Sequence, residues 1–96
     1  MFERLDPLLH APLRLGVISI LTQQEEAHFI ELQKKTSSTA GNLSIQIKKL
    51  EKAGYLKVVK QFQNNYPQTI CKITNEGREA FESYLIAMDS YINRKK

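Results

Sequence analysis

The sequence predicts a single α+β domain that is mainly helical and carries one small β-hairpin. Two stretches, 39–53 and 75–93, repeat apolar residues at spacings of three and four, and a capping threonine stands at the start of each. Two β-rich runs, 55–62 and 69–74, flank the polar loop 63–68. A chain of 96 residues with 42% hydrophobic content is the size of one globular unit with one core.

Composition limits the partners and the compartment. Fourteen basic residues against ten acidic ones give a formal net charge of +4, which favours a polyanionic partner. The lone cysteine, Cys71, cannot form an intramolecular disulfide, and His10 and His28 are too isolated to suggest a metal pair. No apolar run approaches the roughly 20 residues that span a bilayer, and acidic residues interrupt the N-terminus. We therefore expect a cytoplasmic protein without metal or cofactor.

The first helix is expected over Ala11 to Thr22, after a short arm or helical turn formed by residues 1–10. Pro12 lies in its first turn, where the missing N–H has no helical partner in any case. The wide apolar face consists of Leu13, Val17, Ile18, Ile20 and Leu21. This pattern predicts a largely buried scaffold helix.

A shorter helix is expected over Ile30 to Lys35, after a brief strand at 27–29. The turn Thr36 to Ser38 then leads into the helix 39–53, and a turn of about three residues is usual in a helix-turn-helix. Thr39 can cap the free N–H groups at the start of this helix. Gly54 can take the left-handed conformation that ends it.

The helix 39–53 divides into two faces. At about 100° per residue, one stripe is apolar and must be buried; it consists of Ala40, Leu43, Ile47 and Leu50. The opposite side mixes small, amide, hydroxyl and cationic groups; it consists of Gly41, Ile45, Lys48 and Lys52, flanked by Asn42, Ser44 and Lys49. Such a surface suits a DNA groove, although a solvated helix face would also account for the lysines.

The hairpin 56–74 that follows a helix-turn-helix is a wing. Its tip would lie beside the groove that the helix enters, where Lys60, Asn64 and Asn65 could reach sugar-phosphate or a minor-groove edge. The order of the elements therefore predicts a winged helix-turn-helix occupying residues 11–74.

The last segment, 75–96, is expected to form a long helix with a basic tail. Its apolar seam recurs at spacings of three and four, with Phe81, Tyr84, Leu85, Met88, Tyr91 and Ile92 as its members. Part of this seam is expected to pack against a second copy of the chain, because so small a domain would struggle to cover every aromatic itself. Packing within the chain's own core is the simpler alternative.

At the level of motifs, the chain resembles the small winged-helix transcriptional regulators related to the MarR and ArsR groups. The marker of one compact subfamily stands here as Gly41-Asn42-Leu43-Ser44, and Lys48-Lys49-Leu50-Glu51-Lys52-Ala53-Gly54-Tyr55 resembles the family's exit from that helix. Ile73 to Arg78 resembles the start of its last helix, and Leu5 to His10 its opening, so the likeness runs from about Leu5 to Tyr91. Departures are the pair Ile45-Gln46, where the family more often has Arg-His, and a wing tip without arginine.

The resemblance implies a homodimeric regulator, a repressor in family terms, that reads a pseudo-palindromic site in double-stranded DNA. The expected DNA contacts are Thr39, Gly41, Asn42, Ser44, Ile45, Gln46, Lys48, Lys49, Lys60, Asn64 and Asn65. Among them, the amides of Asn42 and Gln46 suit adenine and Ile45 suits a thymine methyl. No catalytic constellation is visible, and a small-molecule effector would have to act between helices or at the dimer interface. The alternative is a winged helix that binds another protein instead of specific DNA.

Overall fold

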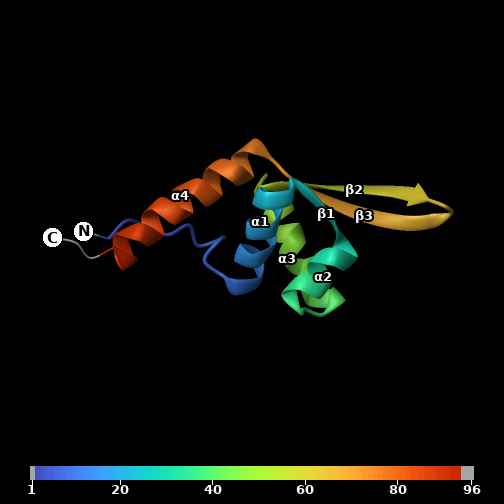
Figure 1. Ribbon diagram of the computed structural model, residues 1–96, viewed down its shortest axis with the longest axis horizontal. Helices are drawn as coiled ribbons and strands as arrows, with labels where there is room; N and C mark the ends of the chain where they lie inside the picture. The colour runs from blue at the N-terminus through green and yellow to red at the C-terminus, as the bar shows by residue number, and fades with distance from the viewer. Residues whose placement is uncertain (1, 94–96) are drawn as a thin grey trace.

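Four helices and a three-stranded antiparallel sheet make up the protein, whose computed structural model describes residues 2–93 (Figure 1). In chain order these are α1 (Pro12–Gln24), β1 (Glu26–His28), α2 (Phe29–Thr36), α3 (Ala40–Lys52), β2 (Leu56–Gln63), β3 (Tyr66–Ile73) and α4 (Asn75–Ile92). This is the predicted order of elements, and the predicted α+β winged helix-turn-helix is confirmed. The basic tail expected at 94–96 lies outside the described residues.

The sheet has the order β1-β3-β2, so the short first strand lies against the returning strand of the hairpin. Ala27 of β1 opposes Cys71 of β3, and Val58 of β2 opposes the same cysteine from the other side. Strand β1 pairs only with residues 70–72 of β3. The rest of the hairpin therefore projects beyond the body of the protein as a two-stranded wing (Figure 1).

The turn of the wing is tighter than the sequence analysis predicted. Gln63 pairs with Tyr66, so the turn contains only Asn64 and Asn65, whose φ angles are 53° and 65°. Two consecutive left-handed residues form the hairpin turn whose twist matches that of the strands, and asparagine tolerates this conformation. The predicted loop 63–68 was wrong because the two strands continue to Gln63 and Tyr66, and Pro67 does not interrupt the second strand. Pro67 lies in β3 opposite Phe62, on a stretch that β1 does not cover.

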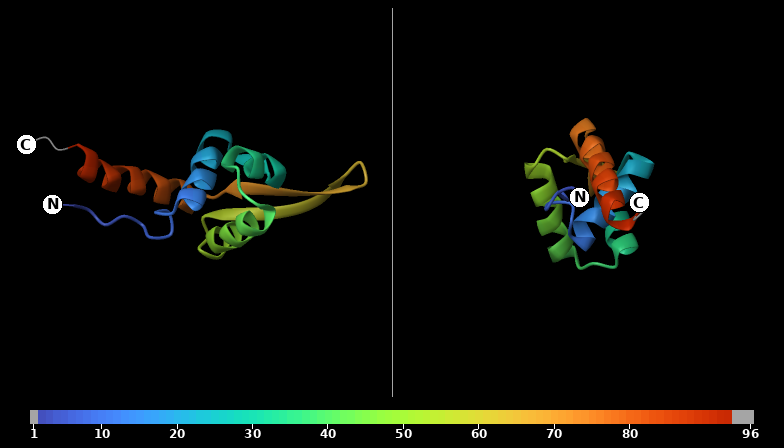
Figure 2. Two further views of the ribbon diagram at one scale, coloured as in Figure 1. Left: turned by 90° about the horizontal axis from the view of Figure 1, so that it is seen from below. Right: turned by 90° about the vertical axis from the view of Figure 1, so that its left-hand side faces the viewer.

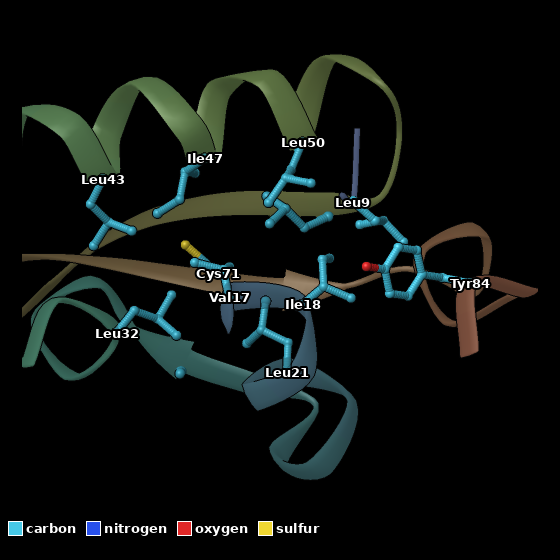
Figure 3. Packing of buried hydrophobic residues seen from close by; sticks show 12 residues of the cluster. Leu9, Val17, Ile18, Leu21, Leu32, Leu43, Ile47, Leu50, Cys71 and Tyr84 are labelled. Carbon is cyan, nitrogen blue, oxygen red and sulfur yellow. The ribbon is translucent and has the colours of Figure 1, made fainter. Parts of the chain in front are cut away.

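The core lies between α1, α3 and the sheet, and α4 closes one end of it (Figure 3). Leu43, Ile47 and Leu50 of α3 point across toward Val17, Ile18 and Leu21 of α1, with Cys71 between the two helices. The predicted stripe on α3 is confirmed at these three leucine and isoleucine positions. It was wrong at Ala40, which is exposed because the helix begins there, at the edge of the core.

Helix α4 and the N-terminal segment extend together away from the wing, in a molecule of 58 × 25 × 21 Å (Figure 2). The rings of Phe2 and Tyr91 stack with centroids 4.7 Å apart, and the Tyr91 hydroxyl donates to the Glu3 carbonyl oxygen at 3.0 Å. The beginning of the expected arm, at Phe2 and Glu3, therefore lies along the second half of α4. At the other end of that helix, Arg78 pairs with Glu25 at 3.5 Å, which ties the start of α4 to the end of α1.

Candidate nucleic-acid interface

The helix-turn-helix is built from local signals at the junction of α2 and α3. Helix α2 ends at Thr36, and Ser37 follows in the left-handed conformation with φ 54°. The Thr39 side-chain oxygen then accepts a hydrogen bond from the Asn42 N–H at 3.1 Å, which caps α3 as the sequence predicted. Because this oxygen serves the cap, the side chain of Thr39 is held against the helix and only partly available to a ligand.

The outward face of α3 is open. Gly41, Asn42, Lys48 and Lys49 are exposed, and Ile45 keeps 55% of its surface accessible even though its side chain is large and aliphatic. No ion pair within residues 2–93 engages Lys48 or Lys49. An unpaired cationic edge around an exposed aliphatic side chain is a surface that can contact phosphates and a thymine methyl together.

Gly41 lies in the first turn of α3, and nothing in the monomer requires glycine there. A Cβ built at this position would meet no atom within 4 Å. Glycine costs a helix roughly 0.5–1 kcal/mol relative to alanine. What the glycine does provide is a bare backbone on the exposed side of the helix, which another molecule can approach closely.

The two amides of the predicted site are already hydrogen-bonded within the protein. Gln46 donates from Nε2 to Asn42 Oδ1 at 3.1 Å, and its own Oε1 accepts from the Arg14 guanidinium of α1. Gln46 is half-buried, so of the pair only Asn42 is exposed.

The wing brings Lys60 to the side of α3. In an antiparallel sheet, directly opposed residues share a face and neighbours along a strand alternate. Lys60 therefore lies on the same face as the buried Leu56, and that face carries the helices. A groove of about 560 Å³ between α3 and the wing is lined by Lys60 together with Ser44, Lys48 and Val58. Residues from two distant segments of the predicted site thus meet in one groove.

The tip of the wing is aromatic and uncharged. Phe62 is 77% exposed and Tyr66 is 70% exposed, on either side of the Asn64-Asn65 turn. Between Lys60 and Lys72 the sequence contains no lysine or arginine. The sequence analysis did not assign Phe62 to the site. Phe62 lies two positions after Lys60 on the same strand, so it shares the face of Lys60, and this spacing could have predicted its place in the site.

The sequence matches the model of a known protein family over most of its length. The family model of the winged helix DNA-binding domain matches residues 13–92. The chain belongs to the winged helix DNA-binding domain family. The match covers both helices of the helix-turn-helix, the wing and all of α4, and it supports the role of a DNA-binding regulator.

Relatives of this winged helix protein include archaeal proteins of the same size class. Uncharacterized protein MJ0432 of Methanocaldococcus jannaschii is 35% identical over 78 residues, which cover 81% of this chain and 85% of that protein. A transcriptional regulator homologue from Pyrococcus horikoshii has a solved structure with a TM-score of 0.84, 32% identity, and coverage of 90% of this chain and 85% of its own.

More distant structures share the fold alone. BpsR of Bordetella bronchiseptica, whose DNA binding is regulated by 6-hydroxynicotinic acid, superposes with a TM-score of 0.75 at 15% identity, over 93% of this chain and 67% of its own. MarR-like transcriptional regulators are thus the structural neighbours of this winged helix domain. The Gly-Asn-Leu-Ser subfamily marker, which rested on resemblance, stays a prediction.

Residues 2–93 contain no reactive thiol, no metal-binding cluster and no membrane-spanning helix. Burial raises the pKa of the Cys71 thiol to about 11, so the thiol stays protonated near neutral pH. Cys71 is a free, buried cysteine. Residues 2–93 contain no cluster of three histidine, cysteine or acidic side chains that could hold a metal ion. None of the helices there is long and apolar enough to cross a bilayer.

Proposed function

We propose that this protein is a homodimeric transcriptional regulator that binds a specific sequence in double-stranded DNA and represses the promoter containing it. In this proposal α3 of each protomer enters the major groove, the two half-sites lie about one helical turn apart, and the wing follows the adjacent backbone. The observation that carries the proposal is the open face of α3, where unpaired lysines and the exposed Ile45 adjoin the groove containing Lys60.

The proposed contacts divide by chemistry. Lys48, Lys49 and Lys60 neutralise phosphates, and the bare backbone at Gly41 allows the first turn of α3 to approach the duplex. Asn42, Ser44 and Ile45 face base edges, while the asparagines of the wing tip reach the sugar-phosphate backbone or the minor groove. Gln46 does not contact a base itself in this proposal, because its amide is hydrogen-bonded to Arg14 and Asn42.

The second copy is proposed to dock on the outer side of α4. Tyr84 is 3% exposed, and Phe81 and Met88 pack against the core, so this part of the predicted seam already has partners inside the monomer. Leu85 and Ile92 lie beside this face of the helix, at its edge, and are 51% and 69% exposed. Neighbouring apolar side chains that remain exposed to water favour association with a second apolar surface.

A small-molecule effector has a possible site between the N-terminal segment and α4. A cleft of about 500 Å³ there is lined by Arg4, Asp6, Tyr55 and Tyr84, among others. NadR has been solved in complex with 4-hydroxyphenylacetate, so regulators of this fold can bind a small aromatic acid. We propose the cleft as the place where such a ligand would act on the arm and α4.

Salt dependence of DNA binding tests the proposal. Each phosphate neutralised adds about 0.9 to the slope of log K against log salt, so three lysines in each of two protomers predict a slope of roughly −5. Between 50 and 200 mM salt the affinity should then fall by about a factor of 10³. Fluorescence anisotropy with duplexes selected from a random pool measures both the slope and the preference for sequence.

Two lysines of the same strand provide a matched pair of variants. Lys60→Ala removes a cation from the face that carries α3 and should reduce the slope by about 0.9 for each protomer. Lys57→Ala removes one from the opposite face of the same strand and should leave the slope unchanged. Equal effects of the two variants would contradict the placement of the wing. A protein that binds duplexes without any slope or sequence preference would favour the protein-interaction alternative.

A further inference from the structure

A chain of hydrogen bonds connects the scaffold helix α1 to the open face of α3. Arg14 donates from Nη1 to Gln46 Oε1, and Gln46 donates from Nε2 to Asn42 Oδ1 at 3.1 Å. Arg14 is itself anchored, because its Nε donates to the Leu8 carbonyl oxygen at 2.6 Å. Arg14 and Gln46 are half-buried, and the chain ends at the exposed Asn42.

The chemistry of arginine determines the direction of every bond in this chain. A guanidinium has donors and no acceptor, so it must face the oxygen of the Gln46 amide and not its NH₂ group. The NH₂ group of Gln46 then points along the helix toward residue 42, four positions earlier, where side chains on a helix are neighbours. Asn42 must therefore accept this hydrogen bond with its side-chain oxygen, and its NH₂ group is left pointing outward.

We propose that Arg14 determines which bases α3 reads, by holding Asn42 with its amide donor outward and its acceptor occupied. A free asparagine recognises adenine by donating to N7 and accepting from the N6 amino group. An amide oxygen has two lone pairs, but the bond from Gln46 holds Oδ1 toward residue 46 and away from a base edge, so the second of these bonds is disfavoured. The remaining donor fits a base edge that presents acceptors, such as guanine with O6 and N7, or thymine with O4.

This inference rests on the proposed placement of α3 in the major groove, and it replaces the expectation that Asn42 and Gln46 both read adenine. Arg14 acts here as a positioning residue through two other side chains. The size of the effect follows from a single base contact, since one good bidentate pair discriminates against a wrong base by roughly 5- to 150-fold. A change of about tenfold in preference at one base pair is therefore expected when the chain is broken.

Selection of bound sequences from a random duplex pool, with the full-length protein, tests the inference. Asn42→Ala first identifies the base pair where preference is lost. At that base pair the wild type should prefer guanine or thymine to adenine. Gln46→Glu keeps an acceptor for Arg14 but cannot donate to residue 42, so it should release the Asn42 oxygen and shift the preference toward adenine. Arg14→Met, which keeps an unbranched stem and removes the donors, should shift it in the same direction.

Lys49→Gln serves as the control for charge, because it also removes one positive charge from the interface without touching the hydrogen-bond chain. It should weaken binding to all sequences and leave the preference unchanged. Should Arg14→Met fail to fold, as judged by circular dichroism, Gln46→Glu still decides the question. A wild type that prefers adenine at this base pair overturns the inference, as does an unshifted preference in Gln46→Glu or an Asn42→Ala variant that loses none. A wild type that selects no sequence at all would instead overturn the proposed function.

Discussion

Alanine at position 77 should destabilise the fold severely, whereas the same substitution at position 41 should not. Both glycines lie in the first turn of a helix. A Cβ at Gly77 would stand 2.1 Å from the Tyr55 carbonyl oxygen, while a Cβ at Gly41 would have no neighbour within 4 Å. The two variants therefore make the same chemical change in opposite surroundings.

The expected cost at Gly77 follows from what the methyl group displaces. A Cβ and a backbone oxygen need about 3 Å, so the start of α4 must move away from the start of β2. That movement strains two hydrogen bonds, from Thr74 N to Tyr55 O at 3.1 Å and from Thr74 Oγ1 to Gly54 O at 2.6 Å. Overpacking costs about 1–3 kcal/mol and each lost hydrogen bond about 1 kcal/mol, which together give about 3–5 kcal/mol.

Urea denaturation followed by circular dichroism, at one fixed protein concentration, measures the difference. The whole domain is worth about 5–14 kcal/mol for a chain of this length, so Gly77→Ala should lose a large fraction of its free energy of unfolding. Gly41→Ala should be neutral or up to about 1 kcal/mol more stable, because alanine is the better helix former. Stability of Gly77→Ala within about 0.5 kcal/mol of the wild type would refute the close approach between α4 and β2.

Three further predictions concern DNA, assembly and the thiol. Gly41→Ala should keep the fold but weaken DNA binding about fivefold or more, because its methyl group would hold the helix backbone away from the duplex and cost at least about 1 kcal/mol. Unchanged affinity in an anisotropy titration would show that the duplex does not approach the backbone at residue 41. Sedimentation of the wild type should give twice the monomer mass of 11.1 kDa, and Leu85→Glu should shift it toward the monomer, since a charge cannot be buried unpaired in an apolar interface; a wild type that stays monomeric at micromolar concentration would remove the paired-site proposal. Cys71 should react with iodoacetamide far more slowly in the folded protein than in urea, because burial raises its pKa to about 11. The unfolded chain loses this proton near pH 9 while the folded protein keeps it, so stability should fall between pH 9 and 11; equal alkylation rates in both states would contradict the burial.

The wing illustrates how a correct element can be predicted with a wrong turn. The alternation of apolar residues in 56–62 was a sufficient signal for a strand, and the hairpin followed from its partner at 69–73. The sequence analysis predicted a loop for the six residues 63–68, although Asn64-Asn65 alone forms the turn. Strand pairing beyond the core is decided by backbone hydrogen bonds and by the turn residues. The polar character of the side chains carries little information there, because both faces are in water.

What the sequence by itself determined is the set of helices, their caps and the buried stripe of α3. Thr39, Gly54 and Thr74 act through bonds to residues a few positions away, so their effect can be read from a short window. The tertiary structure alone decided which polar groups of α3 are free. Arg14 reaches Gln46 across 32 positions, and Tyr84 turns into the core while Leu85, its neighbour, remains in water. Such contacts depend on how the helices pack against one another, and a periodic pattern identifies a face of a helix without naming what will cover it.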